Sequence, residues 1–159
     1  MKLITKRSIS RHWMMFLFTG LILISLSARS FAAMPKIGES YGGGIVFYVD
    51  GTGQHGLIAA KADVTGHSEG KEEGVMNWYD ANVAANAFLE GYGDWFLPNR
   101  EQLNQLYLNR SAVGNILDTY YWSSSESNAS NAWVYNFTSG KQLAGSKANG
   151  SCVRAVRTF

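Results

Sequence analysis

The sequence predicts an α+β domain in which short strands surround two helices. Three observations support this fold class. Two β-prone runs flank a glycine-rich turn near residue 50, two later segments carry apolar residues at helical spacing, and past Gly114 the apolar pattern changes to a period of two residues. The pattern therefore changes twice along the chain, from strand to helix and back to strand.

The first 32 residues predict an export signal that is removed from the mature protein. Four basic residues within the first eleven precede an apolar run from Trp13 to Leu26, and Ser30-Phe31-Ala32 places small residues at both positions that signal peptidase requires. We expect cleavage after Ala32, with Ala33 as the alternative. The apolar run is shorter than the roughly 20 residues of a membrane span, so we expect no stable membrane insertion. The protein would reach the periplasm, the cell surface or the medium.

Removal of the leader changes the charge of the chain. The 159 residues include 14 Lys and Arg and 12 Asp and Glu, but five of the basic residues and no acidic residue lie in the first 32, so residues 33–159 carry a net charge of −3. This length fits one domain, and we expect no nucleic-acid partner. All four basic residues after Glu126 lie in a stretch without acids, which could form an anion-facing surface or remain scattered surface charge.

The first predicted element is a β-hairpin. Its strands are Ile45–Val49 and Leu57–Ala60, and residues 50–53 have the sequence DGTG, which tolerates the positive φ angles of a turn. Residues 62–74 are polar and dotted with glycine, which predicts a surface loop with a solvated charged face.

A first helix is predicted within NWYDANVAANAFLEGYG. Asp80 is its expected N-cap and Gly91 its expected C-terminal stop. The interior alanines indicate close packing on a sheet. The apolar residues at helical spacing are Val83, Ala84, Ala87 and Phe88.

A second helix is predicted to begin within LPNREQLNQLY. Pro98 disfavours helical backbone before it, Asn99 is a strong N-cap residue, and Gln102 stands where its side chain can bond back to the cap. Glu101 in the first turn suits the helix dipole, and no second carboxylate or base is placed beside it for catalysis. The apolar stripe is Leu103, Leu106 and Tyr107.

The last third of the chain predicts strands. Tyr120–Ser123 is one of them, Gly140 and Lys141 mark a turn, and Cys152–Val156 is the last strand. Arg154 and Arg157 should fall on opposite faces of that last strand. In a further strand, one face would carry Trp133, Tyr135 and Phe137 and the other Ala132, Val134 and Asn136.

Metal, redox and nucleophile chemistry are poorly supported. Cys152 has no second cysteine to pair with after the leader, and its strand context predicts a buried inert thiol. His55 and His67 have no partner at zinc-ligand spacing, so we expect no metal site and no cofactor. Three consecutive serines at 123–125 lack the GxSxG pattern of a nucleophile elbow.

The order of the motifs resembles a bacterial domain family typified by the C-terminal domain of the Legionella collagen-like adhesins. The resemblance runs from about Gly38 to Phe159, and its most specific segments are GDWFLPN, YWSSSE and VRAVR. The chain is similar, more distantly, to the C-type-lectin-like fold shared with formylglycine-generating enzymes. This implies two helices packed on small, mostly antiparallel sheets, with the N- and C-terminal strands paired.

The resemblance also implies an exported or surface module, since the adhesin example binds sulfated glycosaminoglycans as a trimer. This chain has no collagen-like Gly-x-y tract, so a trimer imposed by a stalk is not implied, and a homo-oligomer is left open. It has no EPN or WND signature of calcium-dependent lectins, which disfavours calcium-dependent sugar binding. One lone Cys152 does not supply formylglycine-generating chemistry.

Two function classes remain. The first is an adhesin-like binding module for a glycan or another surface polymer, because aromatic faces stack on sugar rings and amides and hydroxyls bond to their OH groups. The second is a polysaccharide hydrolase with paired carboxylates such as Asp94 and Glu126, and a structural or protein-interaction role in the cell envelope is also open. The candidate ligand-binding residues are Trp122, Ser123, Ser125, Glu126, Asn128, Trp133 and Arg154.

Overall fold

The strands gather at the two ends of the described chain and the helices lie between them. The computed structural model describes residues 34–88 and 90–159, so the predicted export signal and its cleavage site lie outside the described residues. In chain order the elements are β1 (Ser40–Tyr41), β2 (Gly44–Val49), β3 (Gly56–Ala59), α1 (Trp78–Ala87), α2 (Arg100–Leu108), α3 (Arg110–Val113), β4 (Tyr120–Asn128), β5 (Asn131–Asn136), β6 (Lys141–Ser146) and β7 (Val156–Thr158).

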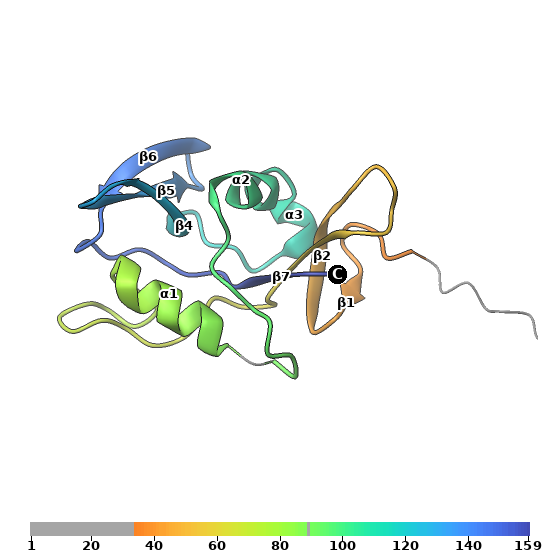
Figure 1. The fold of residues 1–159 in the computed structure, drawn as a ribbon, viewed down its shortest axis with the longest axis horizontal. Helices are drawn as coiled ribbons and strands as arrows, with labels where there is room; N and C mark the ends of the chain where they lie inside the picture. Colours follow the sequence, from red (N-terminus) through yellow and green to blue (C-terminus); the bar gives the residue numbers. More distant parts are fainter. Residues whose placement is uncertain (1–33, 89) are drawn as a thin grey trace, which may run out of the picture. The chain divides into compact units, whose positions relative to one another are not determined.

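Two antiparallel sheets form the framework. One has the strand order β1-β2-β3-β7 and the other the order β4-β5-β6. Figure 1 shows α1 on one side of β7 and α2 with α3 on the other. The predicted α+β class with antiparallel sheets is confirmed. The expected pairing of the N- and C-terminal strands is wrong in detail, because β7 pairs with β3 while β1 lies at the opposite edge of the same sheet.

The hairpin forms where the sequence predicted it. β2 and β3 pair antiparallel with a register shift between Val46 and Tyr48, and the Asp50 backbone NH bonds to the His55 carbonyl oxygen at 2.8 Å. Gly53 has a φ of +75°, a region that favours glycine. This closure holds Asp50 and His55 together at the turn end of the hairpin.

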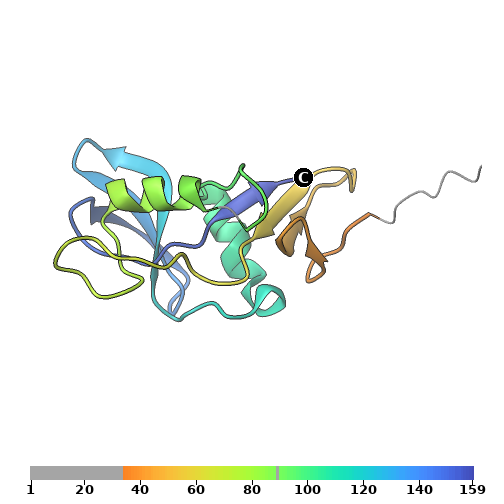
Figure 2. The ribbon, with the colours of Figure 1, turned by 90° about the horizontal axis from the view of Figure 1, so that it is seen from below.

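Helix α1 corrects the prediction at both ends. Its N-cap is Asn77, whose side chain accepts a hydrogen bond from the Asp80 backbone NH at 3.0 Å, and the helix ends at Ala87, ahead of Gly91. Its buried residues are Ala81 and Ala85, whereas Val83 is 69% exposed. Small alanines let the helix approach β4, the strand behind it in Figure 2, and this close packing decides which face is buried.

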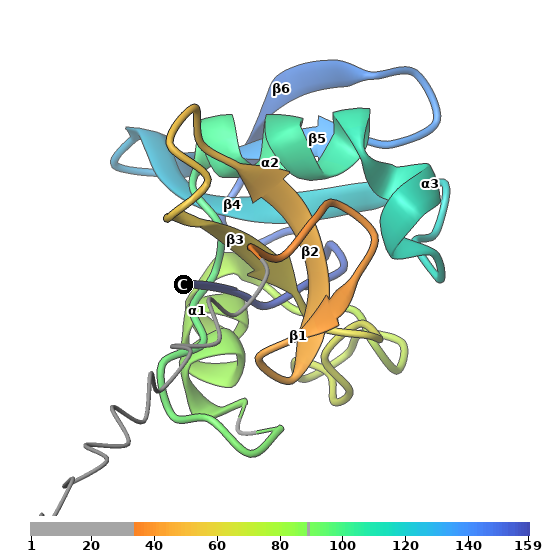
Figure 3. The same cartoon turned by 90° about the vertical axis from the view of Figure 1, so that its right-hand side faces the viewer.

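Helix α2 confirms the predicted cap. Asn99 accepts a hydrogen bond from the Gln102 backbone NH, and the Gln102 side chain accepts one from the Asn99 backbone NH, each at 2.8 Å. Leu103 and Leu106 are buried, and Tyr107 packs against the same core. Figure 3 shows α2 alongside β4 and above β2, and the helix contacts both sheets. The short helix α3 that follows was not predicted.

Alternate residues of a strand enter two different cores. One core includes Val46, Ile58, Trp95, Trp122 and Val134 and lies against α1, while the other includes Phe47, Leu103, Tyr121, Tyr135 and Phe137 and lies against α2. The predicted alternation in β5 is therefore confirmed, with both of its faces in use. The strands β2, β3, β4 and β5 are consequently buried on both faces, whereas β1 and most of β6 are exposed.

The C-terminal segment departs from the prediction of a strand over Cys152–Val156. Only Val156–Thr158 pairs as a strand, while the preceding backbone bonds in turn to different neighbours. Cys152 exchanges backbone hydrogen bonds with Tyr120 and Trp122 of β4, and the carbonyls of Val153 and Ala155 accept from Val64 and Ala60. The segment thus links the two sheets instead of extending one of them.

Candidate functional site

Three predicted ligand-binding residues lie in the interior, which corrects their assignment. Trp122 has no exposed surface, and its indole NH donates to the Met76 carbonyl oxygen at 2.8 Å. Ser123 is 1% exposed, and its hydroxyl donates to the Trp133 carbonyl oxygen at 2.9 Å. Neither side chain is accessible to a ligand, because both are buried and their polar groups are hydrogen-bonded within the protein.

Arg154 is the third of these buried residues. Its Nε pairs with Asp63 Oδ1 at 2.7 Å, and its terminal nitrogens donate to the carbonyl oxygens of Ala60 and Asn115. The second oxygen of Asp63 accepts from the Tyr121 hydroxyl at 2.8 Å. This network joins the C-terminal segment to β4 and to the chain after β3, so Arg154 supports the fold and does not meet a ligand.

Arg154 and Arg157 do not lie on opposite faces of one strand, because only Arg157 belongs to β7, and Arg157 is mostly buried. Its guanidinium lies 2.8 Å from Asp94 and donates to the Gly42 carbonyl oxygen, with 13% of the side chain exposed. The hydrogen bond from Arg157 holds the pKa of Asp94 below its ordinary value. Burial raises the pKa of the Cys152 thiol to about 11, which confirms the predicted buried thiol.

The other four predicted residues are at least partly exposed, but their side chains contact other parts of the protein. Ser125 accepts a hydrogen bond from the Arg100 backbone NH at 3.0 Å, and Glu126 pairs with the Lys147 ammonium at 2.5 Å. Asn128 accepts hydrogen bonds from two backbone NH groups in the turn between β4 and β5. These three side chains therefore stabilise the β4–β6 sheet and its contact with the start of α2.

Trp133 is half-buried beneath a cation. The Arg100 guanidinium lies 3.9 Å from the centroid of the indole ring, and Arg100 Nε also donates to the Gln142 side-chain oxygen. The ring face that would stack on a sugar is therefore covered by the protein's own arginine. The four surface residues lie along one sheet, but they line neither the cavity between the β2–β3 hairpin and α2 nor the cavity over Trp122.

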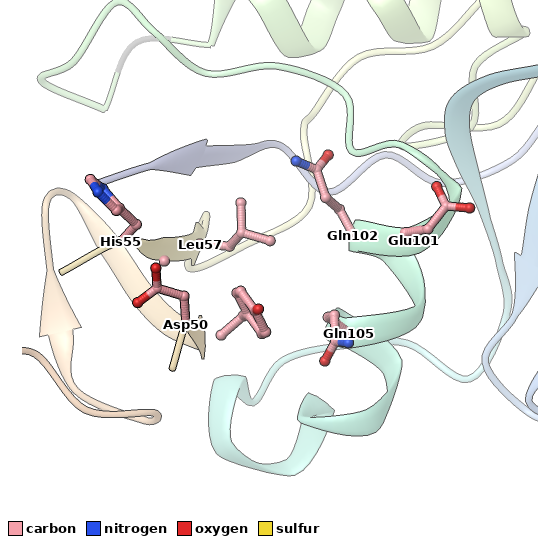
Figure 4. A pocket seen from close by; sticks show the side chains of 8 residues that line it. Asp50, His55, Leu57, Glu101, Gln102 and Gln105 are labelled. Atoms are coloured by element: carbon pink, nitrogen blue, oxygen red, sulfur yellow. The ribbon is translucent and has the colours of Figure 1, made fainter. Parts of the chain in front are cut away.

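A cavity of about 370 Å³ lies between the β2–β3 hairpin and helix α2. Figure 4 shows Asp50 and Leu57 on the hairpin side, opposite Gln102 and Gln105 on the helix. Its size is within the range of about 300–1,000 Å³ that small-molecule sites occupy. The lining residues are Tyr48, Asp50, His55, Gly56, Leu57, Glu101, Gln102 and Gln105.

Local structure orients the walls of this cavity. Asp50 Oδ1 accepts hydrogen bonds from the Thr52 backbone NH and hydroxyl, which fixes the carboxylate at the end of β2. On the helix, burial of Leu103 and Leu106 on the core side turns Gln105 toward the hairpin and leaves Glu101 exposed. Two segments fifty residues apart thus present polar groups to one space.

Most of the polar side chains that line this cavity are not bonded to other described residues. Among the described residues, the side chains of Tyr48, His55, Glu101 and Gln105 have no hydrogen-bond partner, and Asp50 keeps Oδ2 unused. The hydrogen bond from the Thr52 hydroxyl lowers the pKa of Asp50, which favours its carboxylate form. Carboxylates, amides and a phenol can together accept from and donate to a hydroxyl-rich ligand.

A second cavity, of about 230 Å³, lies on the face of the β4–β6 sheet that carries Trp122 and Val134. Trp122 forms its buried floor, and Tyr120 and Leu143 stand at its side, each about two-fifths exposed at 43% and 42%. Its few polar groups include Asn149 and Ser151. This cavity offers apolar contact with little hydrogen bonding, so the first cavity is the better candidate site.

Residues 34–88 and 90–159 contain neither a metal-binding cluster nor a membrane-spanning helix. No three His, Cys, Asp or Glu side chains come together there in a geometry that could hold a metal ion. His67 pairs with Glu73 at 3.0 Å, while His55 lies in the first cavity. Within the same residues, no helix combines the length and the apolar character needed to cross a bilayer.

The two carboxylates considered for hydrolysis belong to separate ion pairs. Asp94 pairs with Arg157 beside the first sheet, and Glu126 pairs with Lys147 at the β4–β5 hairpin. A glycosidase acid needs a raised pKa, whereas the pKa shifts resolved for carboxyls of the described residues are all downward, at Asp50, Glu73 and Asp94. The geometry gives no support to the hydrolase alternative.

Sequence reasoning missed most of the candidate site. It treated residues 50–53 as a turn and Gln102 as part of a helix cap, and both local roles are confirmed. It gave no signal for Tyr48, His55 or Gln105 as site residues. The meeting of the helix with the hairpin is a tertiary contact that no local pattern encodes.

The comparisons with known proteins bear on the domain as a whole. Residues 55–157, more than half of the chain, match the family model described as the Lcl C-terminal domain. The matched region begins at His55 and contains α1, α2 and the whole β4–β6 sheet. The curated proteins contain no match to this chain.

Proposed function

The chain belongs to the Lcl C-terminal domain family, and on this premise we propose that it is an exported, adhesin-like module that binds a glycan or a similar surface polymer. The family membership favours an adhesin-like module. Glycan binding, export and the C-type-lectin-like classification of the fold are the finer parts of this proposal. The leader described above supports export, and mature protein beginning at Ala33 or Met34, measured by mass spectrometry of exported material, would test it.

The observation that carries the proposal is the cavity between the hairpin and α2. The residues that line it include a tyrosine, a histidine, two acidic residues and two glutamines around a space of about 370 Å³. Sugars present hydroxyl groups around a compact ring, and sites of this composition bind them through many directional hydrogen bonds. The cavity is open on the surface, so a longer polymer could pass through it while one unit is held.

We expect weak, metal-independent binding. An open site leaves much of a sugar exposed to water, and each hydroxyl exchanges a bond to water for a bond to protein, which gives a small net gain. Adhesion by such modules gains strength from several copies binding one polymer. A homo-oligomer would meet this need, and we propose it as the working state of the module.

A glycan array tests the proposed function. The exported protein should bind a subset of hydroxyl-rich glycans equally with and without chelator, and binding should persist at moderate salt. Loss of binding with chelator would refute the metal-free site, and loss at moderate salt would indicate simple charge attraction. Binding to no glycan, together with capture of a defined protein partner, would contradict the proposal.

Two variants, one inside and one outside the cavity, test whether the glycan binds between the hairpin and α2. Gln105→Ala removes a free amide from the cavity and should weaken glycan binding about tenfold, since a lost hydrogen bond leaves its ligand partner unpaired. Ser111→Ala makes a comparable change on exposed α3, outside the cavity, and should leave binding unchanged. Equal binding by both variants would move the site away from the hairpin and α2.

A further inference from the structure

Asn149 precedes a glycine in the exposed turn that follows β6. No other asparagine in the 159 residues is followed by glycine. The side chain of Asn149 is exposed and lines the cavity over Trp122, and it has no hydrogen-bond partner within residues 34–88 and 90–159. Its amide is therefore open to water and is not held in place by the protein.

Packing against the chain before α1 requires glycine at position 150. A Cβ atom there would lie 2.4 Å from Val75 Cγ1 and 3.2 Å from Lys71 Cδ, and the β-branched Val75 side chain has little freedom to rotate away. Next to this contact, the backbones of Met76 and Ser151 exchange two hydrogen bonds, at 3.1 and 3.0 Å. A side chain at position 150 would push these two segments apart. The fold thus fixes which residue follows Asn149.

The same glycine leaves a backbone nitrogen available for reaction. Among the described residues, the Gly150 backbone NH donates no hydrogen bond, whereas those of Asn149 and Ser151 donate to the carbonyl oxygens of Ser146 and Met76. No Cβ at residue 150 hinders the approach of this nitrogen to the Asn149 side chain. Two reacting groups in adjacent residues form an intramolecular pair, so the reaction does not need a catalyst to bring them together.

We propose that Asn149 is a site of spontaneous deamidation and isomerisation, a modification that is independent of the proposed glycan binding. The Gly150 backbone nitrogen attacks Asn149 Cγ, and the new C–N bond closes a succinimide ring. The side-chain NH₂ group leaves with the Gly150 amide proton as ammonia. Water then opens the ring at either carbonyl and gives aspartate or isoaspartate, so the sequence of steps consumes only water.

The two products affect the fold differently. Aspartate changes only the side chain, and it adds a negative charge to residues 127–159, which contain no acid. Isoaspartate routes the backbone through the former side chain and makes it longer. The Met76–Ser151 hydrogen bonds lie next to this change, and the Met76 carbonyl oxygen also accepts from the Trp122 indole. We therefore expect isoaspartate at position 149 to lower the free energy of unfolding.

Peptide mapping of the exported protein tests the site after storage at mildly alkaline pH, which promotes ring closure. Mass spectrometry detects the conversion of amide to acid, and isoaspartyl methyltransferase labels isoaspartate. Asn128 is the internal control, because it lies at an exposed turn but is followed by Ala129. Asn149 should react at least about tenfold faster than Asn128, because the Cβ of Ala129 raises the barrier to ring closure.

Two variants separate the reaction from its effect on the fold. Asn149→Gln keeps an exposed amide but would have to close a larger ring, so it should stay unmodified during the same storage. Freshly prepared Asn149→Asp has the added charge without the longer backbone and should unfold like fresh parent protein. Stored parent protein should lose stability in denaturant titration in proportion to its isoaspartate content, and stored Asn149→Gln should not.

The possible results decide the proposal in either direction. Reaction of Asn128 as fast as Asn149, or an Asn149 that stays intact, would overturn the proposed site. Equal loss of stability by stored parent and stored Asn149→Gln would overturn the effect of isoaspartate on the fold. None of these measurements involves a ligand, so their failure leaves glycan binding standing, and binding to no glycan leaves the modification site standing.

Discussion

The β4–β6 sheet and the hairpin–α2 cavity contain similar kinds of polar side chain but use them differently. Along the sheet, Ser125, Glu126 and Asn128 bond to other parts of the protein, whereas Gln105 and Glu101 in the cavity have no partner among the described residues. A group that is satisfied internally stabilises the fold, and a free group beside a cavity can bind. Whether a polar side chain is already hydrogen-bonded within the protein, more than its residue type, therefore separates structural from functional polar residues.

This comparison predicts opposite consequences for substitutions in the two regions. Changes to engaged side chains should lower the free energy of unfolding and leave the specificity of binding intact. Changes to the free side chains of the cavity should do the reverse. Variants that disturb both quantities equally would break the distinction.

The largest stability effect is expected for Asp63→Ala. This change leaves the Arg154 guanidinium buried without its carboxylate, and removal of one partner of a buried ion pair costs about 3–5 kcal/mol. It also removes the acceptor of the Tyr121 hydroxyl. Denaturant titration should show the loss as a lower midpoint with an unchanged slope.

Asp94→Ala is the matched control for this substitution. It removes the carboxylate partner of Arg157, whose ion pair is far more open to water, with 55% of the Asp94 side chain exposed against 18% for Asp63. The loss should therefore be much smaller, because solvent screens the pair. Equal losses for the two variants would show that burial does not set the importance of these arginines.

A smaller effect is expected for Asn99→Ala at the start of α2. The substitution removes the side-chain acceptor for the Gln102 backbone NH and opens the reciprocal cap, with a typical loss of about 1 kcal/mol in the free energy of unfolding. Leu103 and Leu106 still hold the rest of α2 in the core, so glycan binding through Gln105 should persist. A variant as stable as the parent would contradict the role of the capping box.

The elements with local signals were predicted well from the sequence. The cap at Asn99, the DGTG hairpin and the alternation of β5 follow from propensities and spacing over a few residues. The N-cap at Asn77 was missed because Asn and Asp are both strong N-cap residues, and the sequence offers one of each at positions 77 and 80. The structure selects Asn77, with Ala81 and Ala85 packed in the core.

The candidate site was not predictable in the same way. Aromatic, serine and asparagine residues over 122–133 suggested a sugar-binding surface, but Trp122 serves the core and Trp133 is covered by Arg100. Whether a tryptophan is core or surface depends on which helix lies over its strand. That arrangement brings together segments such as 48–57 and 101–105, which are distant in sequence. Local patterns contain no such information.

The smallest expected effect concerns acid and the exposed Asp94–Arg157 pair. The hydrogen bond from Arg157 lowers the pKa of Asp94 below 3.8 in the folded protein, so the pair contributes stability above that pH. The contribution is lost as the pH falls from 3.8 through the lowered pKa, because the unfolded chain takes up the proton first.

Asp94→Asn isolates this contribution. The difference in unfolding free energy between the parent and Asp94→Asn should be constant at neutral and weakly acidic pH and should shrink below pH 3.8. Asp118→Asn, at an exposed position whose carboxylate has no partner among the described residues, should show no such change. A difference that stays constant down to the acid transition would mean that Arg157 is held by the Gly42 carbonyl alone, and that the exposed pair contributes nothing that protonation can remove.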